Sequence, residues 1–303
     1  MHRVLLITPV RNEAPHIAQV ARSVAAQTRP PDAWVIVDDG SSDGTAEALA
    51  ALHAESPPIT LLSAPPQLAA SNGDRLAAGA AARAFNFGLR ARGLDGFTHV
   101  GKLDGDTELP TDYFERLLER FARDPQLGIG GGIRLEPGRA GWRLMAIPRD
   151  HVPGALKLYT RECFEAIGGV REVLGWDGID EVYARMRGFR TRSFPDLQAR
   201  HHRAWGTAGG RLRGRVRYGH ASYAACQPPV WAALKSLKVA RLPPVGISGG
   251  AFLYGYARAW ARSAPRVEDD EFRRFVRAEL RARLVPRRPG RGSRSPGQRS
   301  RER

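Results

Sequence analysis

Residues 34–45 read WVIVDDGSSDGT and contain a strand, a turn and a helix start in direct succession. The apolar residues of Trp34–Val37 follow one another without alternation, as in a strand that is buried on both faces of a sheet. Asp38–Ser41 then ends the strand, and Ser42 or Asp43 is suited to cap the helix that follows. The stretch therefore predicts one βα unit of a parallel sheet.

The same alternation extends over residues 1–110. We expect further strands at Val4–Ile7, Ile59–Leu62 and Phe97–Leu103, and helices at Ala14–Gln27 and Leu76–Arg90. Repeated βα units predict a Rossmann-like α/β fold with a mostly parallel central sheet flanked by helices on both faces. In such sheets ligands bind outside the carboxyl ends of the strands.

The pattern is less regular after residue 110. We expect helices at Tyr113–Arg123, Arg161–Ile167 and Asp180–Met186, a Gly-rich strand at Leu127–Leu135, and a basic loop at Arg203–Arg217. Residues 218–285 are predicted to form a C-terminal helical segment, and residues 286–303 a disordered basic tail. The predicted organisation is therefore a domain at 1–217, with halves at 1–110 and 111–217, followed by the helical segment and the tail.

The composition is that of a soluble globular protein: 303 residues, 42% hydrophobic and 26% charged. It excludes wholesale disorder and a polytopic membrane protein. The two cysteines, Cys163 and Cys226, are too few for a disulfide framework, so we expect a reducing, cytoplasmic location. Prolines interrupt the longest uncharged runs, so no transmembrane helix is expected.

The formal net charge is +16, and residues 286–303 carry seven arginines and one glutamate. Such charge attracts anionic partners, namely nucleotide diphosphates, nucleic acid or acidic lipid headgroups. The segment Pro228–Ala261 mixes aromatic and aliphatic residues with lysines and arginines, as in helices that lie among lipid headgroups. One interpretation is peripheral contact with an anionic membrane at its inner face, strengthened by the tail. The alternative is that the segment packs as an ordinary helical lobe.

Two acidic clusters fall at the expected carboxyl ends of strands. Asp38 and Asp39 follow one strand, and Asp104-Gly105-Asp106 follows another. Carboxylates two residues apart on a turn can bind a hard divalent cation, and the glycine between them lets an ion and a diphosphate approach the backbone. The clusters predict a metal and nucleotide site at this edge of the sheet.

Five motifs follow one another along the chain: Val4–Glu13, Ala25–Thr28, Val37–Thr45, Asn86–Gly88 and Leu103–Asp106. In this order and at this spacing, they resemble the opening of family 2 glycosyltransferases. The resemblance covers roughly residues 4–205. It implies the GT-A fold and transfer of a sugar, with inversion, from a nucleotide-diphosphate sugar to a hydroxyl acceptor. The implied donor is UDP-linked, and the acceptor is a glycan, a lipid or a small molecule. The implied pathway is synthesis of a polysaccharide, a glycolipid or another cell-envelope glycan.

The resemblance also implies roles for single residues around the nucleotide. Pro9 and Glu13 are expected to line the nucleotide pocket, and Asp39 to meet the base. Arg83 or Arg75 is expected to contact the base or the phosphates, and the choice between them stays open.

A second set of implied roles concerns the metal and the acceptor. Asp106, with Asp104, is expected to hold a divalent cation, Mg²⁺ or Mn²⁺, together with the diphosphate. In His201-His202-Arg203, the resemblance assigns a metal ligand to His202 and a diphosphate contact to Arg203. Trp176 resembles the aromatic residue that forms the floor of an acceptor site.

The catalytic base is expected shortly after residue 175. The pair Asp180-Glu181, followed by Arg185 and Gly188-Phe189, matches the order of the family, although the last spacing is shorter. Asp177, Asp180 and Glu181 all remain candidates, and we favour Asp180. Such a base would take the proton of the acceptor hydroxyl, while the metal supports the departing diphosphate.

Other classes of protein fit the sequence less well. A sugar-1-phosphate nucleotidyltransferase shares the α/β core but opens on a Gly-rich basic loop, which Thr8–Glu13 is not. A dinucleotide oxidoreductase needs the last glycine of G-x-G-x-x-G, which the run at Gly128–Gly132 lacks. A non-catalytic nucleic-acid-binding protein fits the pI near 10.9, but acidic clusters at strand ends would repel phosphates. We therefore expect no nucleic-acid partner.

Overall fold

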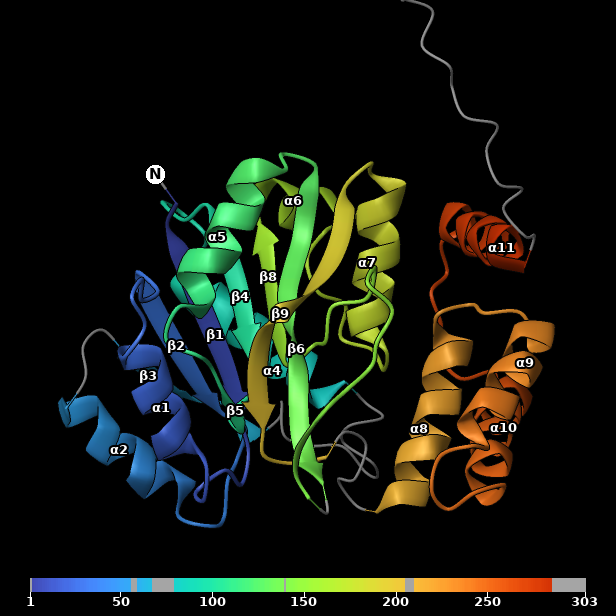
Figure 1. Ribbon diagram of the computed structural model, residues 1–303, viewed down its shortest axis with the longest axis horizontal. Coiled ribbons are helices and arrows are strands. Elements are labelled where there is room, and N and C mark those ends of the chain that lie inside the picture. Colours follow the sequence, from blue (N-terminus) through green and yellow to red (C-terminus); the bar gives the residue numbers. More distant parts are fainter. Residues whose placement is uncertain (1, 56–58, 67–78, 139, 205–209, 285–303) are drawn as a thin grey trace, which may run out of the picture.

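The computed structural model describes residues 2–55, 59–66, 79–138, 140–204 and 210–284 (Figure 1). The strands are β1 (Val4–Val10), β2 (Ala33–Asp38), β3 (Ile59–Ser63), β4 (His99–Leu103), β5 (Thr107–Glu108), β6 (Leu127–Gly138), β7 (Gly141–Leu144), β8 (Leu156–Thr160) and β9 (Arg190–His201). The helices are α1 (Ile17–Ala25), α2 (Thr45–Glu55), α4 (Ala80–Arg92), α5 (Tyr113–Arg123), α6 (Arg161–Ala166), α7 (Trp176–Met186), α8 (Arg211–Ala224), α9 (Pro229–Val239), α10 (Ile247–Ala261) and α11 (Asp270–Leu284). Arg75 and the predicted basic tail lie outside the described residues.

Within the described residues, the strands form one nine-stranded sheet in the order β3-β2-β1-β4-β8-β6-β9-β5, with β7 paired to β6. The strands β3, β2, β1 and β4 are all parallel, as the βα repeats predict. Strand β8 is antiparallel to both β4 and β6, and β9 lies parallel to β6. The predicted α/β architecture is confirmed, and its antiparallel pairs lie in the half of the sheet beyond β4.

Helices cover both faces of this sheet (Figure 1). Along β1, Val4 and Leu6 pack into the core shared with α1 and α5, whereas Leu5 and Ile7 pack into the core shared with α4, α6, α7 and α11. The alternation arises because successive side chains of a strand point to opposite faces. Burial on both faces explains why this strand reads as a continuous apolar run.

The motif Asn86-Phe87-Gly88 has a packing role in α4. A Cβ on Gly88 would lie 2.8 Å from Val37 Cγ2 and 3.1 Å from Ile7 Cγ2, so a glycine is needed where the helix crosses the sheet. The side-chain amide of Asn86 donates to the carbonyl oxygen of Val170 at 2.8 Å. The motif therefore holds α4 against the strands that end at the candidate site.

The predicted C-terminal helical segment is confirmed. Helices α8, α9 and α10 pack beside the sheet (Figure 1) around their own apolar cluster, which includes Phe252. A Cβ on Gly219 of α8 would lie 1.9 Å from the carbonyl oxygen of Phe252, and a Cβ on Gly255 of α10 would lie 2.0 Å from that of Val216. These glycines let α8 and α10 pack in close contact. Helix α11 returns to the α/β body, where Phe272 packs in the same core as α7.

The basic loop expected at Arg203–Arg217 is wrong from Arg211 onward, because α8 begins there. The arginines and glycines of this stretch suggested a loop, but Gly214 is buried within the helix. The domain boundary expected at residue 217 consequently falls inside α8.

No helix in the described part of the chain is both long and apolar enough to cross a membrane.

Candidate active site

The loops after β1 and β2 are locked together at the carboxyl edge of the sheet. The N–H of Ser42 donates to Asn12 Oδ1 at 2.8 Å, and the N–H of Asn12 donates to Ser41 Oγ at 3.0 Å. The N–H of Glu13 donates to Thr45 Oγ1 at 2.8 Å. Asn12 has a φ of 55°, which asparagine tolerates better than most residues. The two loops form one hydrogen-bonded rim.

Asp104 and Asp106 lie directly after β4, and the fold brings His201 to them from the end of β9. One oxygen of each carboxylate and one imidazole nitrogen lie within 4.8 Å of one another. His201 reaches this place because β5 pairs with β9, with Thr107 opposite His201. Two carboxylates and an imidazole suit Mn²⁺, and the carboxylates suit Mg²⁺. The cluster therefore fits a divalent cation.

The backbone around this cluster is tightly packed. A Cβ on Gly105 would lie 2.7 Å from Val10 Cγ1, so the glycine between the aspartates is required by the close approach of β1. The ammonium of Lys102 is buried and donates to the Asp104 carboxylate and, at 3.2 Å, to the carbonyl oxygen of Gly154. Lys102 therefore orients the first aspartate from within the sheet.

Arg203 connects the cluster to the β1 loop. Its guanidinium donates to the Glu13 carboxylate, and its Nε lies 3.5 Å from Asp106 Oδ2. Burial raises the pKa of Glu13 to about 8; the charge of Asp106 adds to this effect and Arg203 opposes it. Glu13, Asp106 and Arg203, all singled out on the sequence, thus lie together.

His202 does not lie in the cluster, and its neighbour His201 takes the place that the sequence suggested for it. The His202 ring stacks on His16, with centroids 5.0 Å apart, and its Nε2 lies 3.4 Å from Glu108 Oε2. Adjacent residues at a strand end point to opposite sides, so only one of the two histidines can face the aspartates. The position expected for His202 is therefore occupied by His201, which is the histidine that could join a metal site.

The remaining residues expected at the nucleotide lie around the same edge. Asp39 is buried; its N–H donates to the carbonyl oxygen of Val10 at 2.9 Å, and Arg11 donates to the Asp39 carbonyl oxygen at 2.6 Å. Pro9 is part of β1, and Arg83 lies half-buried in the first turn of α4. The contacts of Pro9, Asp39 and Arg83 with a nucleotide therefore stay predictions.

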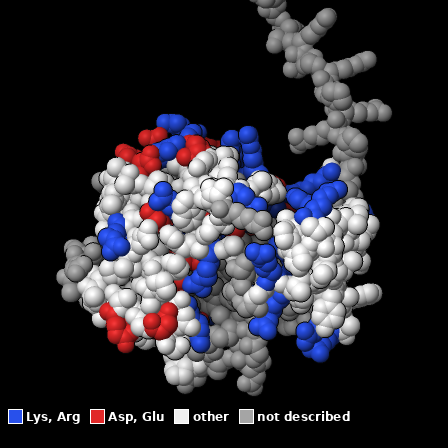
Figure 2. Space-filling view, turned by 60° about the horizontal axis from the view of Figure 1, so that its bottom comes forward, with Lys and Arg blue, Asp and Glu red and all other residues white. Residues whose placement is uncertain are grey.

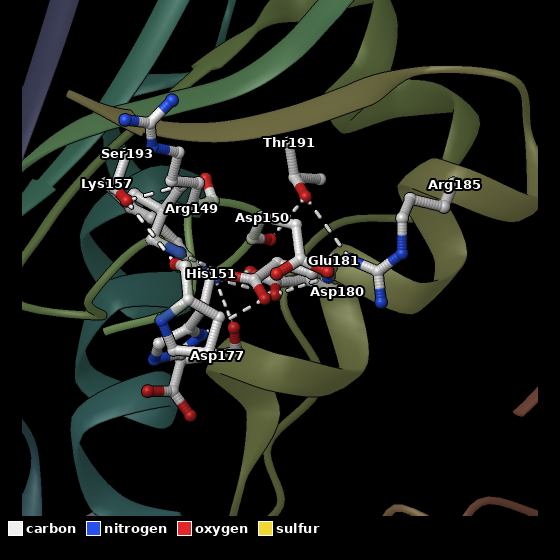
Figure 3. Close-up of polar contacts among 12 residues, drawn as sticks. Arg149, Asp150, His151, Lys157, Asp177, Asp180, Glu181, Arg185, Thr191 and Ser193 are labelled. Carbon is white, nitrogen blue, oxygen red and sulfur yellow. Dashed lines mark hydrogen bonds and ion pairs between the residues drawn. The ribbon is translucent and has the colours of Figure 1, made fainter. Parts of the chain in front are cut away.

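Asp180 lies in a buried polar cluster beneath the sheet edge (Figure 3). Its carboxylate accepts from Lys157 Nζ at 2.7 and 3.0 Å and from the Tyr159 hydroxyl. The residue is 1% exposed, and burial raises the pKa of Asp180 to about 6 against the opposing charge of Lys157. A carboxylate in this position has structural partners and no access to an acceptor.

Glu181 belongs to the same cluster. It accepts from the N–H of Val152 at 2.7 Å, its Oε2 lies 3.1 Å from His151 Nδ1, and its Oε1 lies 3.2 Å from Lys157 Nζ. Burial disfavours its charge, but Lys157 and His151 outweigh burial and lower the pKa of Glu181 to about 2. Glu181 is therefore a buried, paired anion, like its neighbour.

Asp177 differs from both. Helix α7 begins at Trp176, after Gly175 with a φ of 81°, rather than at Asp180 as the sequence suggested. Asp177 is consequently in the first turn and partly exposed, and its carboxylate points away from the buried cluster (Figure 3). Within the described residues its carboxylate makes no hydrogen bond. This geometry argues against Asp180 as the base and favours Asp177, one of the alternatives kept open.

The substitution Asp180→Asn is expected to destabilise the protein by about 3 kcal/mol, because it leaves the buried Lys157 without its main counter-ion. Urea unfolding measures this loss. The control is Glu165→Gln, which removes an exposed i,i+4 pair with Arg161 and should cost at most about 0.5 kcal/mol. Unchanged stability of Asp180→Asn would contradict the structural role.

Lys102 and Lys157 are positions of the candidate site that the sequence reasoning missed. They are cross-strand partners on β4 and β8, and both lie beside the Trp176 ring, at 5.4 and 5.5 Å from its centroid. A signal was present, since lysine is rare in this arginine-rich chain. The half-buried Trp176, expected at the acceptor, thus lies over the lysines that hold Asp104 and Asp180.

Arg134 was also missed. This residue of β6 is 8% exposed, and its Nε lies 3.8 Å from Glu136 Oε1. Burial lowers the pKa of Arg134, while Glu136, Asp177 and Asp104 oppose this shift. Arg134 is thus a buried cation whose surroundings include both acidic regions of the site.

The comparisons with known proteins agree with this arrangement. A profile of the family described as glycosyl transferase family 2 matches residues 5–170, more than half of the chain. The succinoglycan biosynthesis protein ExoA of Rhizobium meliloti (strain 1021) is 26% identical over 195 residues, which are 55% of this chain and 53% of that protein. The chain spans about half the length of this curated relative.

Solved structures share the fold. The mannosyltransferase PcManGT from Pyrobaculum calidifontis, in complex with GDP-Man and Mn²⁺, matches with a TM-score of 0.56 and 21% identity, over 94% of this chain and 81% of that chain. S. aureus TarS 1-349, in complex with UDP-GlcNAc, matches with a TM-score of 0.53 and 13% identity, over 86% and 73%. At these identities the likeness concerns the fold.

The sheet, its covering helices and the acidic edge define a protein of the GT-A fold. The chain belongs to glycosyl transferase family 2. Among the classes weighed on the sequence, this family favours the sugar transferase over the nucleotidyltransferase and the nucleic-acid-binding protein.

Proposed function

We propose that the chain transfers a sugar from a nucleotide-diphosphate sugar to a hydroxyl acceptor, with inversion and with a divalent cation. The observation that carries the proposal is the cluster of Asp104, Asp106 and His201 at the carboxyl edge of the sheet. These residues would hold the cation, which when bound supplies Lewis-acid stabilisation to the departing diphosphate. Arg203 is proposed to contact the same phosphates, and its position beside Asp106 supports this role.

The proposed base is Asp177. Its carboxylate takes the proton of the acceptor hydroxyl, and the hydroxyl oxygen displaces the diphosphate from the opposite side of the sugar in one step. The first turn of a helix favours an anion, so the N-terminus of α7 supports the ionised carboxylate. Trp176, the preceding residue, is proposed as the floor of the acceptor site. Positioned general-base assistance contributes about 10² to 10⁴-fold in rate.

The finer identity of the substrates is part of the proposal. Pro9, Glu13 and Asp39 are proposed to line the nucleotide pocket, with Arg83 at the base or the phosphates and uracil as the base. PcManGT was solved with GDP-Man and TarS with UDP-GlcNAc, so the fold accommodates either base. A cell-envelope polysaccharide or glycolipid is proposed as the product, because the curated relative is a succinoglycan biosynthesis protein. The proposed location is cytoplasmic.

Binding of a nucleotide diphosphate is expected to require the metal. A thermal-shift screen of UDP, GDP, ADP and CDP, with and without Mn²⁺ or Mg²⁺, measures this. At a ligand concentration of about 100 times the Kd, stabilisation is about 2.7 kcal/mol, enough to raise Tm by several degrees. We expect UDP to stabilise the protein only with the cation. Equal stabilisation without metal, or by no nucleotide, contradicts the proposal.

A further inference from the structure

Helices α9 and α10 and their connection expose large apolar side chains. Val245 is 73% exposed, Leu237 65%, and Val230 and Trp260 64% each. The other members of this set are Leu234, Leu242, Ile247, Leu253 and Tyr254. Single exposed apolar residues are normal, but a concentration of them on adjacent elements indicates an interaction surface. We refer to these nine residues as the apolar surface.

Helical geometry organises the part of the apolar surface that lies on α9. Val230, Leu234 and Leu237 are spaced at i, i+4 and i+7, so they lie along one side of the helix, while Ala232 and Val239 are buried on the other. Trp231 of α9 also packs partly against the core of the α/β body. Helix α9 therefore contacts its neighbours with one side and still exposes three large apolar residues on the other.

Helix α10 shows the same division. Phe252, Tyr256 and Ala259 are buried in the cluster shared with α8 and α9, whereas Leu253 and Tyr254 are 40% and 58% exposed. The interior of the helical group is therefore already filled by other side chains. Its exposed residues are available to a partner outside the described structure.

The charge around the apolar surface has one sign. Between Leu197 and Val267 the sequence contains twelve lysines and arginines and no aspartate or glutamate. Lys238 and Arg241 follow the apolar side of α9, and Arg258 lies on the exposed side of α10. In Figure 2 the helical group, at the right, is white with blue at its edges. A partner that binds the apolar surface must therefore be compatible with, or attracted by, positive charge.

A cavity adjoins the apolar surface. It has a volume of about 440 Å³, and Val230, Trp231 and Trp260 contribute to its walls. Arg273 and Arg277 of α11 also line it. Apolar and aromatic walls beside guanidinium groups suit an amphiphilic anion, because the apolar part is removed from water while the anionic part is paired.

We propose that the apolar surface, with its flanking lysines and arginines, docks on an anionic phospholipid membrane. Apolar residues would enter the headgroup region and the cations would meet acidic headgroups, as in helices that lie in the plane of an interface. A second copy of this chain is disfavoured as the occupant, because it would bring equal positive charge against this surface. Helix α8 also lies against the start of α7, where a Cβ on Gly175 would be 3.0 Å from Ala221 Cβ. Helix α8 thus links α10, which carries part of the apolar surface, to the start of the helix that carries the proposed base.

Sedimentation of the full chain with vesicles tests the proposal without donor or metal, so its outcome is independent of the proposed function. We expect binding to phosphatidylcholine vesicles that contain phosphatidylglycerol to be at least about tenfold stronger than to phosphatidylcholine alone, and to weaken with salt. Leu237→Glu should weaken binding about tenfold, because it places a carboxylate in the headgroup region.

Two matched control variants distinguish binding through the apolar surface from non-specific adsorption to vesicles. Leu144→Glu changes an apolar residue on β7 that is 45% exposed, and should leave vesicle binding unchanged. Lys238→Glu should weaken binding, whereas Arg123→Glu on α5 should not. Circular dichroism and urea unfolding check that each variant is folded.

Three outcomes overturn the proposal. The first is that anionic vesicles do not retain the protein at low salt. The second is equal binding of Leu237→Glu and the parent chain, which would assign binding to the arginines of residues 286–303. The third is that Leu237→Glu abolishes self-association in sedimentation equilibrium while vesicle binding persists, which would assign the apolar surface to a contact between copies.

Discussion

Replacing Asp106 by Asn is expected to lower sugar transfer by at least about 10³-fold and to abolish metal-dependent stabilisation by a nucleotide diphosphate. The physical reason is that Asp106 contributes one of the three clustered donor atoms, together with Asp104 and His201. A neutral amide in its place binds a divalent cation far more weakly than a carboxylate. The measurements are initial rates of donor turnover and the thermal shift with Mn²⁺ and nucleotide.

The control for this variant is Asp95→Asn, which alters a fully exposed aspartate in a weak pair with Arg161. It should leave both rate and thermal shift unchanged. His201→Ala should share the metal defect of Asp106→Asn, whereas His202→Ala should retain metal-dependent nucleotide binding. If Asp106→Asn turns over donor at the parent rate, the metal assignment fails.

Replacing Asp177 by Asn is expected to reduce transfer by about 10² to 10⁴-fold while nucleotide and metal binding stay intact. The amide keeps the size of the side chain but cannot take the acceptor proton. Because Asp177 is partly exposed and outside the Asp180 cluster, stability should change little. Rates with donor and acceptor, nucleotide thermal shifts and urea unfolding together distinguish a catalytic from a folding defect.

Asp180→Asn provides the contrasting pattern. Its expected defect is in stability, and transfer by the folded fraction should remain well above that of Asp177→Asn. The opposite pattern, an inactive but stable Asp180→Asn beside an active Asp177→Asn, would return the role of base to Asp180. Comparing the two isosteric variants therefore decides between the carboxylates.

Local patterns in the sequence were sufficient to predict the parallel half of the sheet and the acidic residues at its edge. Val4–Ile7 and Trp34–Val37 are apolar without interruption because they are buried on both faces, and this burial is a property of each strand by itself. Asp39, Asp104 and Asp106 follow such strands directly. Their common position follows from parallel strand direction alone, so no long-range contact had to be known.

Only tertiary structure distinguished between the two adjacent histidines and among the three acidic residues near the start of α7. His201 faces the aspartates and His202 does not, because the pairing of β5 with β9 sets which side of the strand end is turned inward. Among the three acidic residues near the start of α7, the start of the helix at Trp176 leaves Asp177 at the surface and turns Asp180 toward Lys157. Neither the register nor the partner strand is encoded in the adjacent residues.

The sequence by itself therefore determined the fold class, the acidic edge and the helical C-terminal segment, because these follow from runs of neighbouring residues. Tertiary structure alone decided which histidine joins the cluster, which carboxylate is exposed, and that Lys102, Lys157 and Arg134 lie among the acidic groups. The reason is that burial and counter-ions come from strands far apart in the chain. Lys157 on β8 and Asp180 on α7 meet only when the sheet and its helices are assembled.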